Sequence, residues 1–262
     1  MSNRSEIPPL SLAVTSLNEA SRIGRCLASA SSLVREIVVV DSGSTDSTIA
    51  MAEEAGARII RQAWLGHREQ KQVALNQCTQ PWVLILDCDE ELSGTLIDSI
   101  RNFFSSGDVD WFHGCRFNRK VRFLGRWITH GDWYPDTKLR LVRRDKAKMG
   151  GNASHDVTLV DGDVKHLHGD LLHDSFPTIR SYLDKISPFA DEFVERQRNE
   201  GRRWSLAQNL LRPIWRFFRA YILRLGFLDG FPGLWIAYAT AFSVFVRYSR
   251  KYEDEANEVS GK

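Results

Sequence analysis

Two carboxylates separated by a single residue, Asp87 and Asp89, directly follow the apolar run from Trp82 to Leu86. Such a run predicts a buried parallel strand, and open α/β sheets bind their ligands at the carboxyl ends of these strands. Two carboxylates there can share a divalent cation, which would neutralise a diphosphate while a bond to it breaks. The alternative is that the pair only caps the next helix. The pair alone leaves both interpretations open.

Three strand-to-helix units precede this pair. Leu10 to Val14 predicts a strand that is followed by a polar turn and a helix. Ile37 to Val40 repeats this pattern and ends at Asp41, which begins a turn rich in serine and threonine. Arg58 to Arg61 predicts a third strand, and His67 to Gln77 predicts its helix. Alternation of this kind indicates a mostly parallel sheet that is covered by helices.

Three segments, in this order and spacing, carry a resemblance to a known family. They are Thr-Ser-Leu-Asn-Glu at 15–19, Val-Val-Val-Asp-Ser-Gly-Ser-Thr-Asp-Ser-Thr at 38–48 and Leu-Asp-Cys-Asp-Glu at 86–90. Together they resemble family 2 glycosyltransferases of the GT-A fold, most strongly over about the first 110 residues. Segments 134–141, 154–156 and 226–230 are similar to the bacterial lipopolysaccharide-core β-1,4-glucosyltransferase branch. The resemblance implies an α/β protein with a Rossmann-like mixed, mostly parallel sheet flanked by helices, followed by C-terminal amphipathic helices.

The resemblance also implies a binding site for a UDP-sugar donor. Thr15, Glu19 and Asp41 would hold uracil and ribose at the first two strand-to-helix turns. Lys71 would contact the nucleotide, and Asp87 would contact the ribose or a metal. Glu19 has an alternative as a helix-start residue, and Lys71 has one as a solvated residue on its helix.

A divalent cation, Mn²⁺ or Mg²⁺, is the implied cofactor. Asp89 would bind it directly, with Asp87 as a further ligand. In the GT-A fold, a histidine late in the chain commonly completes the set of metal ligands, and His173 is the candidate for this role. A structural histidine is the alternative at that position.

The second half of the chain must supply a general base and the acceptor site. Inverting transfer needs one carboxylate to take the proton of the acceptor hydroxyl, and Asp156 is the candidate, with Asp136 as the second choice. A surface loop aspartate is the alternative for Asp156. His155 would orient the acceptor or the carboxylate, and Arg140 would pair with an active-site acid or the diphosphate. Trp133 closes a basic and aromatic segment that suits an anionic glycan, with an ordinary protruding loop as the alternative.

Composition agrees with a cytosolic protein that forms one large domain, or one domain with a membrane-facing annex. The chain has 262 residues, 43% of them hydrophobic, and a net charge of +2. Its four cysteines form no metal-like cluster, and its amino terminus has no apolar secretory segment. Between 196 and 251 there are eleven lysines and arginines but only two acids, Glu200 and Asp229. This asymmetry predicts an anionic partner for the C-terminal part.

The C-terminal segment combines apolar faces with arginines. Residues 204–225 are rich in Leu, Ile, Trp and Phe and contain four arginines, while the apolar run 233–246 is too short to span a bilayer comfortably. We expect interfacial helices on an anionic membrane surface, at the inner face of the bacterial plasma membrane. The alternative is an amphipathic hairpin packed on the catalytic domain or on a partner subunit.

The predicted organisation is a nucleotide-sugar-binding half at 1–115, an acceptor-binding and catalytic half at 116–195, and amphipathic helices with an acidic tail at 196–262. The predicted function is inverting transfer of a sugar, with glucose as the expected one, to a lipid-anchored saccharide such as lipopolysaccharide inner core. Two alternatives remain: a haloacid-dehalogenase-like phosphatase, and a non-enzymatic, membrane-recruited binding module. Nucleic acid is not an expected partner, because no nucleic-acid-binding module accompanies the basic residues.

Overall fold

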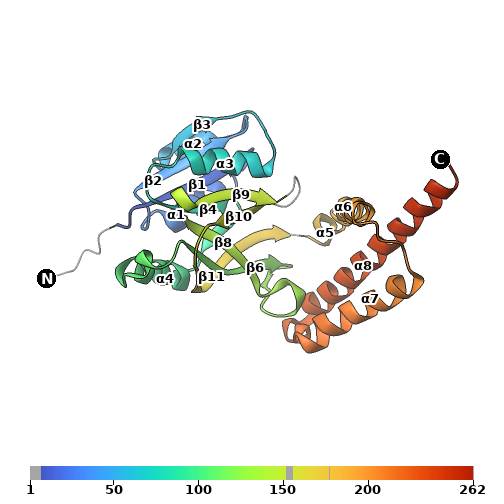
Figure 1. The fold of residues 1–262 in the computed structure, drawn as a ribbon. Coiled ribbons are helices and arrows are strands. Elements are labelled where there is room, and N and C mark those ends of the chain that lie inside the picture. The colour runs from blue at the N-terminus through green and yellow to red at the C-terminus, as the bar shows by residue number, and fades with distance from the viewer. Residues whose placement is uncertain (1–6, 152–155, 177, 262) are drawn as a thin grey trace. The chain divides into compact units, whose positions relative to one another are not determined.

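The computed structural model describes residues 7–151, 156–176 and 178–261. In chain order the elements are β1 (Leu10–Ser16), α1 (Ile23–Ala30), β2 (Glu36–Asp41), α2 (Thr48–Glu54), β3 (Arg58–Arg61), α3 (His67–Gln77), β4 (Trp82–Asp87), β5 (Glu90–Leu92), α4 (Gly94–Ser105), β6 (Gly114–Phe123), β7 (Arg126–Trp127), β8 (Asp136–Arg143), β9 (Ala147–Gly151), β10 (Asp156–Val160), β11 (Val164–Phe176), α5 (Ile179–Leu183), α6 (Ile186–Asn199), α7 (Leu206–Phe218) and α8 (Gly230–Val259). Figure 1 shows their course along the chain.

The main sheet has the strand order β3-β2-β1-β4-β8-β6-β11-β5, and β7 pairs with β6 at its side. Strands β3, β2, β1 and β4 run parallel to their neighbours, whereas β8 joins β4 in an antiparallel pair. Strands β9 and β10 form a separate antiparallel pair. The predicted fold class, a mixed sheet flanked by helices, is confirmed.

Alternating side chains divide the core of the sheet into two apolar layers. Leu12 of β1 and Leu84 of β4 lie in a cluster that α1, α2 and α4 cover. Ala13 and Ile85, their neighbours in sequence, lie in a second cluster on the opposite face, to which α3 contributes. Burial on both faces explains why these strands read as nearly continuous apolar runs. Helices therefore pack on both faces of the sheet, and the parallel strands β1, β2 and β4 place their carboxyl ends side by side.

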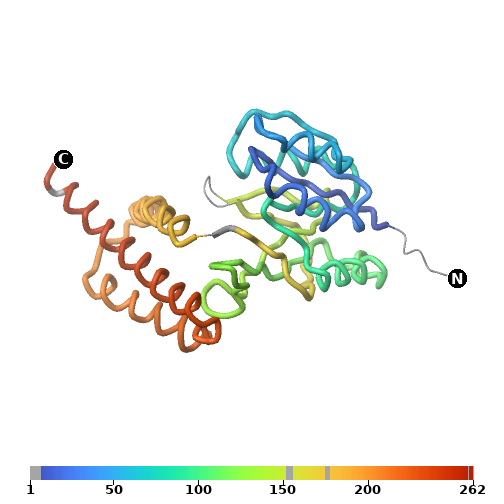
Figure 2. The backbone as a smooth tube through the Cα atoms, turned by 180° about the vertical axis from the view of Figure 1, so that it is seen from behind, coloured from blue at the N-terminus to red at the C-terminus, as the bar shows by residue number. Residues whose placement is uncertain are grey.

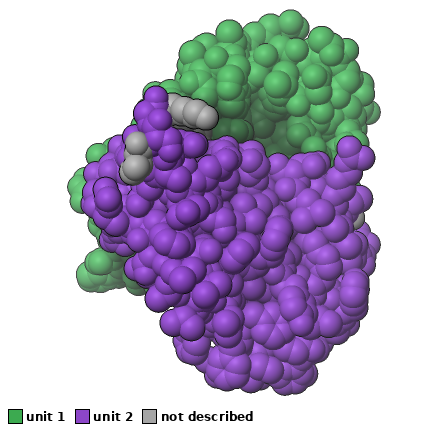
Figure 3. All heavy atoms as spheres, turned by 90° about the vertical axis from the view of Figure 1, so that its right-hand side faces the viewer, with its two compact units in different colours: residues 1–119, 137–173 green, residues 120–136, 174–262 purple. Residues whose placement is uncertain are grey.

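The chain divides into two compact units (Figure 3). Unit 1 comprises residues 1–119 and 137–173, and unit 2 comprises residues 120–136 and 174–262. Unit 2 has its own apolar clusters, in which Phe123 and Ile128 pack with Ile236 of α8. Helices α7 and α8 of this unit lie side by side (Figures 1 and 2). Among the described residues, no helix combines the length and the apolar character that crossing a membrane would require.

Asp229 is a buried carboxylate that connects two segments of unit 2 by hydrogen bonds. It is 0% exposed, and its oxygens accept hydrogen bonds from the Thr129 backbone N–H and hydroxyl, both at 3.0 Å, and from the His130 N–H at 2.8 Å. Its side chain therefore fastens the segment around Thr129 to the start of α8. Asp229 therefore gives the segment 226–230 a structural role within unit 2.

We expect Asp229→Ala to lower the free energy of unfolding by about 3 kcal/mol, because it leaves several buried donors without an acceptor. Denaturant unfolding followed by circular dichroism measures this loss. Asp229→Asn keeps one acceptor oxygen and should lose less. Equal stability of the alanine variant and the unmodified protein would contradict this role for Asp229.

Candidate active site

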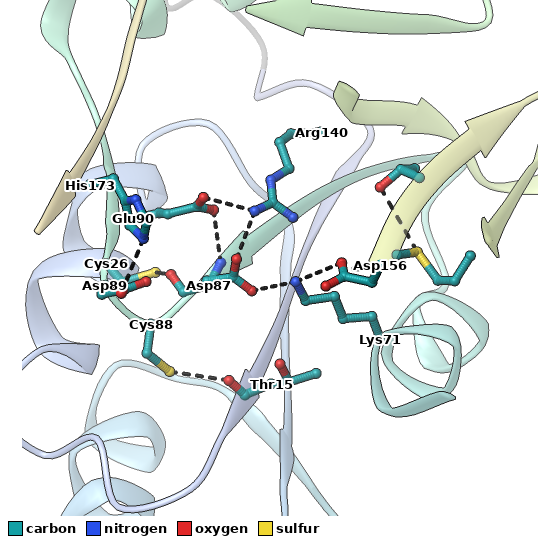
Figure 4. Close-up of polar contacts among 12 residues, drawn as sticks. Thr15, Cys26, Lys71, Asp87, Cys88, Asp89, Glu90, Arg140, Asp156 and His173 are labelled. Carbon is teal, nitrogen blue, oxygen red and sulfur yellow. Dashed lines mark hydrogen bonds and ion pairs between the residues drawn. The ribbon is translucent and has the colours of Figure 1, made fainter. Parts of the chain in front are cut away.

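Asp41 and Asp87, two of the acids singled out in the sequence, lie at the carboxyl ends of neighbouring strands in unit 1. Thr15 of β1 lies opposite Asp87 of β4, and Ser16 lies opposite Asp41 of β2. Figure 4 shows the side chains that surround Asp87. The chain reverses its strand order at β1, since β2 lies on one side of it and β4 on the other. Open α/β sheets bind their ligands at such a reversal.

Asp87 lies between two cations. Its Oδ1 is 2.6 Å from the Lys71 ammonium, and its Oδ2 accepts a hydrogen bond from Arg140 at 2.7 Å. Burial alone raises the pKa of Asp87, but Arg140 and Lys71 lower it by more, so that this pKa lies well below its ordinary value. Asp87 is therefore ionised at neutral pH. Its predicted contact with ribose or metal stays a prediction.

Glu90 is a member of this cluster that the sequence did not single out. It is 0% exposed, and it accepts hydrogen bonds from the Asp87 backbone N–H at 3.0 Å and from Arg140 at 2.8 Å. Arg119 lies 3.5 Å from the same carboxylate. Glu90 thus fixes both the turn after β4 and the Arg140 guanidinium. Its place directly after Asp89 was the available signal, but the sequence did not show which way its side chain points.

Arg140 of β8 is buried between Asp87 and Glu90. Burial lowers its pKa, but the two carboxylates raise it by more, so the pKa of Arg140 lies above its ordinary value. The sequence predicted that Arg140 would pair with an active-site acid or with the diphosphate, and in the structure it pairs with the acids Asp87 and Glu90. Its predicted part in acceptor binding stays a prediction.

His173 and Asp89 are in direct contact. Strands β5 and β11 pair so that His173 lies opposite Glu90, and this places His173 Nε2 3.2 Å from Asp89 Oδ2. Burial raises the pKa of Asp89, but the hydrogen bond and charge of His173 lower it by more, so its pKa lies below the ordinary value. The other ring nitrogen of His173, Nδ1, is buried without a hydrogen-bond partner.

The residues present fit a cation that is shared with a ligand. Asp89 and His173 contact each other and so place a carboxylate oxygen beside a ring nitrogen, while the two oxygens of Asp87 contact the Lys71 ammonium and the Arg140 guanidinium. Within the described ranges, no group of three His, Cys, Asp or Glu side chains is arranged to hold a metal by itself. Mg²⁺ sites commonly use one or two carboxylates together with substrate phosphates, so this pair is suited to such a shared site.

Lys71 joins Asp87 to the candidate base. Its side chain is buried, and its ammonium donates a hydrogen bond to Asp156 Oδ2 at 2.9 Å. The alternative of a solvated Lys71 is therefore wrong. Asp156 begins β10, and α3 is held to the β9–β10 pair by a hydrogen bond from the Met149 N–H to Gln72 at 2.8 Å. The structure thus places Asp156 beside the same Lys71 ammonium that contacts Asp87, whereas His155 lies outside the described residues.

Asp41 organises its own turn. It is 1% exposed, and its carboxylate accepts hydrogen bonds from the Gly43 and Ser44 N–H groups and from the Ser16 hydroxyl at 2.9, 2.8 and 2.9 Å. Burial raises the pKa of Asp41, but these bonds and one from the Ser44 hydroxyl lower it by more, to below its usual value. Its predicted contact with the donor stays a prediction.

Because the folded-state pKa of Asp41 is lowered, this carboxylate stabilises the protein above its unfolded pKa of about 3.9. That stabilisation disappears as the pH falls through the lowered folded pKa. We expect Asp41→Asn to cost about 1–2 kcal/mol at about pH 7, and the difference from the unmodified protein to shrink in acid. Unfolding by urea across this pH range measures it. A difference that is the same at neutral and acid pH would contradict the assignment.

Thr15 and Glu19 flank the first turn. Thr15 is half-buried, and its carbonyl accepts a hydrogen bond from the Cys88 thiol at 3.3 Å. The carboxylate of Glu19 pairs with Arg22 at 2.7 Å, and burial raises the pKa of Glu19. Its backbone N–H donates to Thr48 at 2.7 Å. Glu19 thus lies in the turn before α1, whose first turn contains no acidic residue, and its contact with a donor stays a prediction.

Trp133 and Asp136 belong to unit 2. Trp133 is half-buried, with ring centroids 5.3 Å from Phe123 and 5.4 Å from Tyr182. It thus contributes to the apolar core of that unit. Asp136 is the half-buried first residue of β8. Their predicted acceptor contacts stay predictions.

The fold and this cluster define a glycosyltransferase of the GT-A class, and comparison with known proteins agrees. Residues 11–159 match the family described as Glycosyl transferase family 2. An "Uncharacterized glycosyltransferase" of Rickettsia felis is 31% identical and covers 93% of this chain and 89% of its own. The lipopolysaccharide core biosynthesis glycosyltransferase LpsC of Rhizobium meliloti is 30% identical, with 93% and 94% covered. The chain belongs to the family 2 glycosyltransferases.

Among solved structures, glucosyl-3-phosphoglycerate synthase of Mycobacterium tuberculosis is similar over part of its length. Its complex with Mn²⁺, UDP and glucosyl-3-phosphoglycerate is 19% identical, covers 52% of this chain and 57% of its own, and has a TM-score of 0.37.

Proposed function

We propose that this glycosyltransferase moves a sugar, with glucose as the expected one, from a UDP-sugar to a lipid-anchored saccharide such as lipopolysaccharide inner core. The observation that carries the proposal is the contact of Asp89 with His173, beside the Lys71 ammonium that joins Asp87 to Asp156. The similarity to LpsC, whose name assigns it to lipopolysaccharide core biosynthesis, supports the acceptor class. The family assignment favours transfer over a phosphatase or a non-enzymatic module.

Each group has a part in an inverting displacement. A divalent cation held by Asp89 and His173 would stabilise negative charge on the departing diphosphate. Asp156 would accept the proton of the acceptor hydroxyl while that oxygen attacks the anomeric carbon, and the electrons of the breaking bond leave with UDP. Lys71 holds Asp156 and Asp87 together, and Glu90 with Arg140 keeps Asp87 in place. Groups that are held in advance do not need to reorganise during the reaction.

A panel of sugar nucleotides tests this function. The full chain is incubated with each sugar nucleotide, Mn²⁺ and a lipid-linked core saccharide, and the released nucleotide is measured together with the mass of the saccharide. We expect UDP release coupled to the addition of one sugar residue. UDP release without a change in the saccharide would reject the acceptor class, and turnover with another nucleotide alone would reject the donor.

Membrane association at the inner face of the plasma membrane is part of the proposal. Large apolar side chains of α7 are exposed, including Leu211 at 64%, Ile214 at 67% and Trp215 at 57%. Arginines lie along the same helix, as in helices that bind anionic lipid surfaces. Since α8 supplies Ile236 to the core of unit 2, point substitutions on α7 test the surface better than a truncation would.

We expect the double variant Leu211→Ser/Ile214→Ser to lower partitioning onto anionic vesicles by about a hundredfold, because each side chain loses about 1.5 kcal/mol of apolar burial in the membrane. Vesicle sedimentation measures this. Trp111→Ser, which removes a 76% exposed side chain from unit 1, is the matched control. If the double variant changes the oligomeric state and leaves partitioning intact, the face binds a partner subunit instead.

A further inference from the structure

Five arginines line one cavity in unit 2. The cavity has a volume of about 210 Å³, and its arginines are Arg196, Arg212, Arg216, Arg219 and Arg247. They come from α6, α7, the π-helical turn Arg219–Leu223 and α8. We call this cavity the arginine pocket. Long-range packing assembles it, because its residues are spread over about fifty positions of the chain.

Positive charge in the arginine pocket exceeds the negative charge around it. Asp132 is buried and contacts Arg216 and, at 2.8 Å, Arg219, but it also lies 3.5 Å from Arg224. Glu192 acts electrostatically on Arg247. Asp132 and Glu192 thus offset part of the positive charge of the five arginines. The pocket therefore keeps a net positive charge.

Two donors of the pocket arginines have no acceptor. The Nε–H groups of Arg219 and Arg247 are buried without a hydrogen-bond partner. Burial lowers the pKa of Arg247, and the nearby Arg196 lowers it further. Burial likewise lowers the pKa of Arg216. Partly buried guanidinium groups that repel each other are stabilised when an anion enters, since the anion supplies both charge and acceptor oxygens.

We propose that the arginine pocket binds a phosphate monoester, either the headgroup of a membrane lipid or the phosphate of a soluble saccharide. A phosphate offers several oxygens to guanidinium forks and carries up to two negative charges, which would offset part of the positive charge of the five arginines. The volume is smaller than the roughly 300 Å³ at which sites for drug-sized ligands begin, so it suits a headgroup better than a whole nucleotide. This inference does not depend on the proposed transfer reaction.

Binding of the full chain to vesicles tests the proposal. Phosphatidylcholine vesicles carry either phosphatidic acid, a monoester, or phosphatidylglycerol, a diester, at matched surface charge. We expect tighter binding to phosphatidic acid, and about a tenfold loss of that binding in Arg247→Gln. The control Arg203→Gln removes the same charge from a side chain that is 84% exposed and does not line the pocket. The Arg203→Gln variant should weaken binding to both kinds of vesicle equally and only slightly.

Methyl phosphate, titrated by calorimetry, separates the two sources. Saturable binding that competes with phosphatidic acid vesicles identifies a pocket that accepts soluble monoesters, whereas preference for the vesicles alone identifies a lipid headgroup. Arg212→Gln is the second pocket variant if Arg247→Gln fails to fold, because Arg212 is exposed and packs over the Tyr248 ring. Equal binding to both lipids, or an equal loss in the Arg203 control, would overturn the proposal. So would the absence of binding to both probes.

Discussion

The Asp156→Asn variant is expected to lose about a thousandfold in kcat, while donor affinity changes little. Asparagine keeps the shape of the side chain and can still accept the hydrogen bond from Lys71, so the fold should persist. It cannot accept the proton of the acceptor hydroxyl. Steady-state kinetics with UDP-sugar and a lipid-linked saccharide, combined with calorimetry of donor binding, separates the chemical step from binding.

Asp161→Asn is the matched control for this variant, since Asp161 is an exposed carboxylate just beyond the end of β10. It should leave kcat unchanged. If Asp136→Asn abolishes turnover while Asp156→Asn retains it, the base is Asp136, and the assignment of Asp156 is wrong.

The Asp89→Ala variant is expected to lower kcat/KM by about a thousandfold or more, because a cation that stabilises departing diphosphate contributes several kcal/mol. Asp89 contacts His173 and lies 3.8 Å from Arg22, so its loss should leave the apolar core intact. Activity measured across a range of Mn²⁺ concentrations tests this. Added metal should not restore the variant.

Two further variants complete this experiment: His173→Gln tests the second proposed metal ligand, and Asp98→Ala is the control. His173→Gln removes the second ligand but keeps Asp89, so it should raise the Mn²⁺ concentration needed for half-maximal activity. Asp98→Ala removes an exposed carboxylate from α4 and should behave as the unmodified protein. Full activity of Asp89→Ala would refute the metal assignment.

Periodicity and segment order predicted the framework of unit 1. The runs that form β1, β2 and β4 are buried on both faces, and burial of that kind leaves a clear signal in the sequence. Parallel pairing then required Thr15 and Asp87 to emerge together, as they do. The carboxyl-end position of the site therefore followed from local sequence and general rules of topology.

Contacts between distant side chains could not be predicted in the same way. The helix of Lys71 is polar along most of its length, so its pattern did not show that Lys71 would be buried against Asp87 and Asp156. Glu90 and Arg140 are fifty residues apart and meet only because β8 pairs with β4. Periodicity identifies the buried face of one element, but it does not identify the charged group that this face will meet.

The arginine pocket illustrates the same limit. The excess of arginine after residue 196 predicted an anionic partner, but the pattern could not distinguish a diffuse basic surface from a cavity. Packing of α6, α7 and α8 places Arg196, Arg216 and Arg247 around one cavity, with Asp132 of the turn Gly131–Trp133 paired to Arg216. A site of this kind depends on tertiary structure alone.

Calorimetry of UDP-glucose binding, with and without Mn²⁺, tests the central claim most directly: Asp89 and His173 hold a cation that is shared with a sugar nucleotide. In the unmodified protein we expect Mn²⁺ to tighten donor binding at least about tenfold, and the donor to tighten Mn²⁺ binding by the same factor. Asp89→Ala should bind the donor weakly and without dependence on Mn²⁺. Donor binding that is equally tight without metal, or unchanged in Asp89→Ala, would contradict the account.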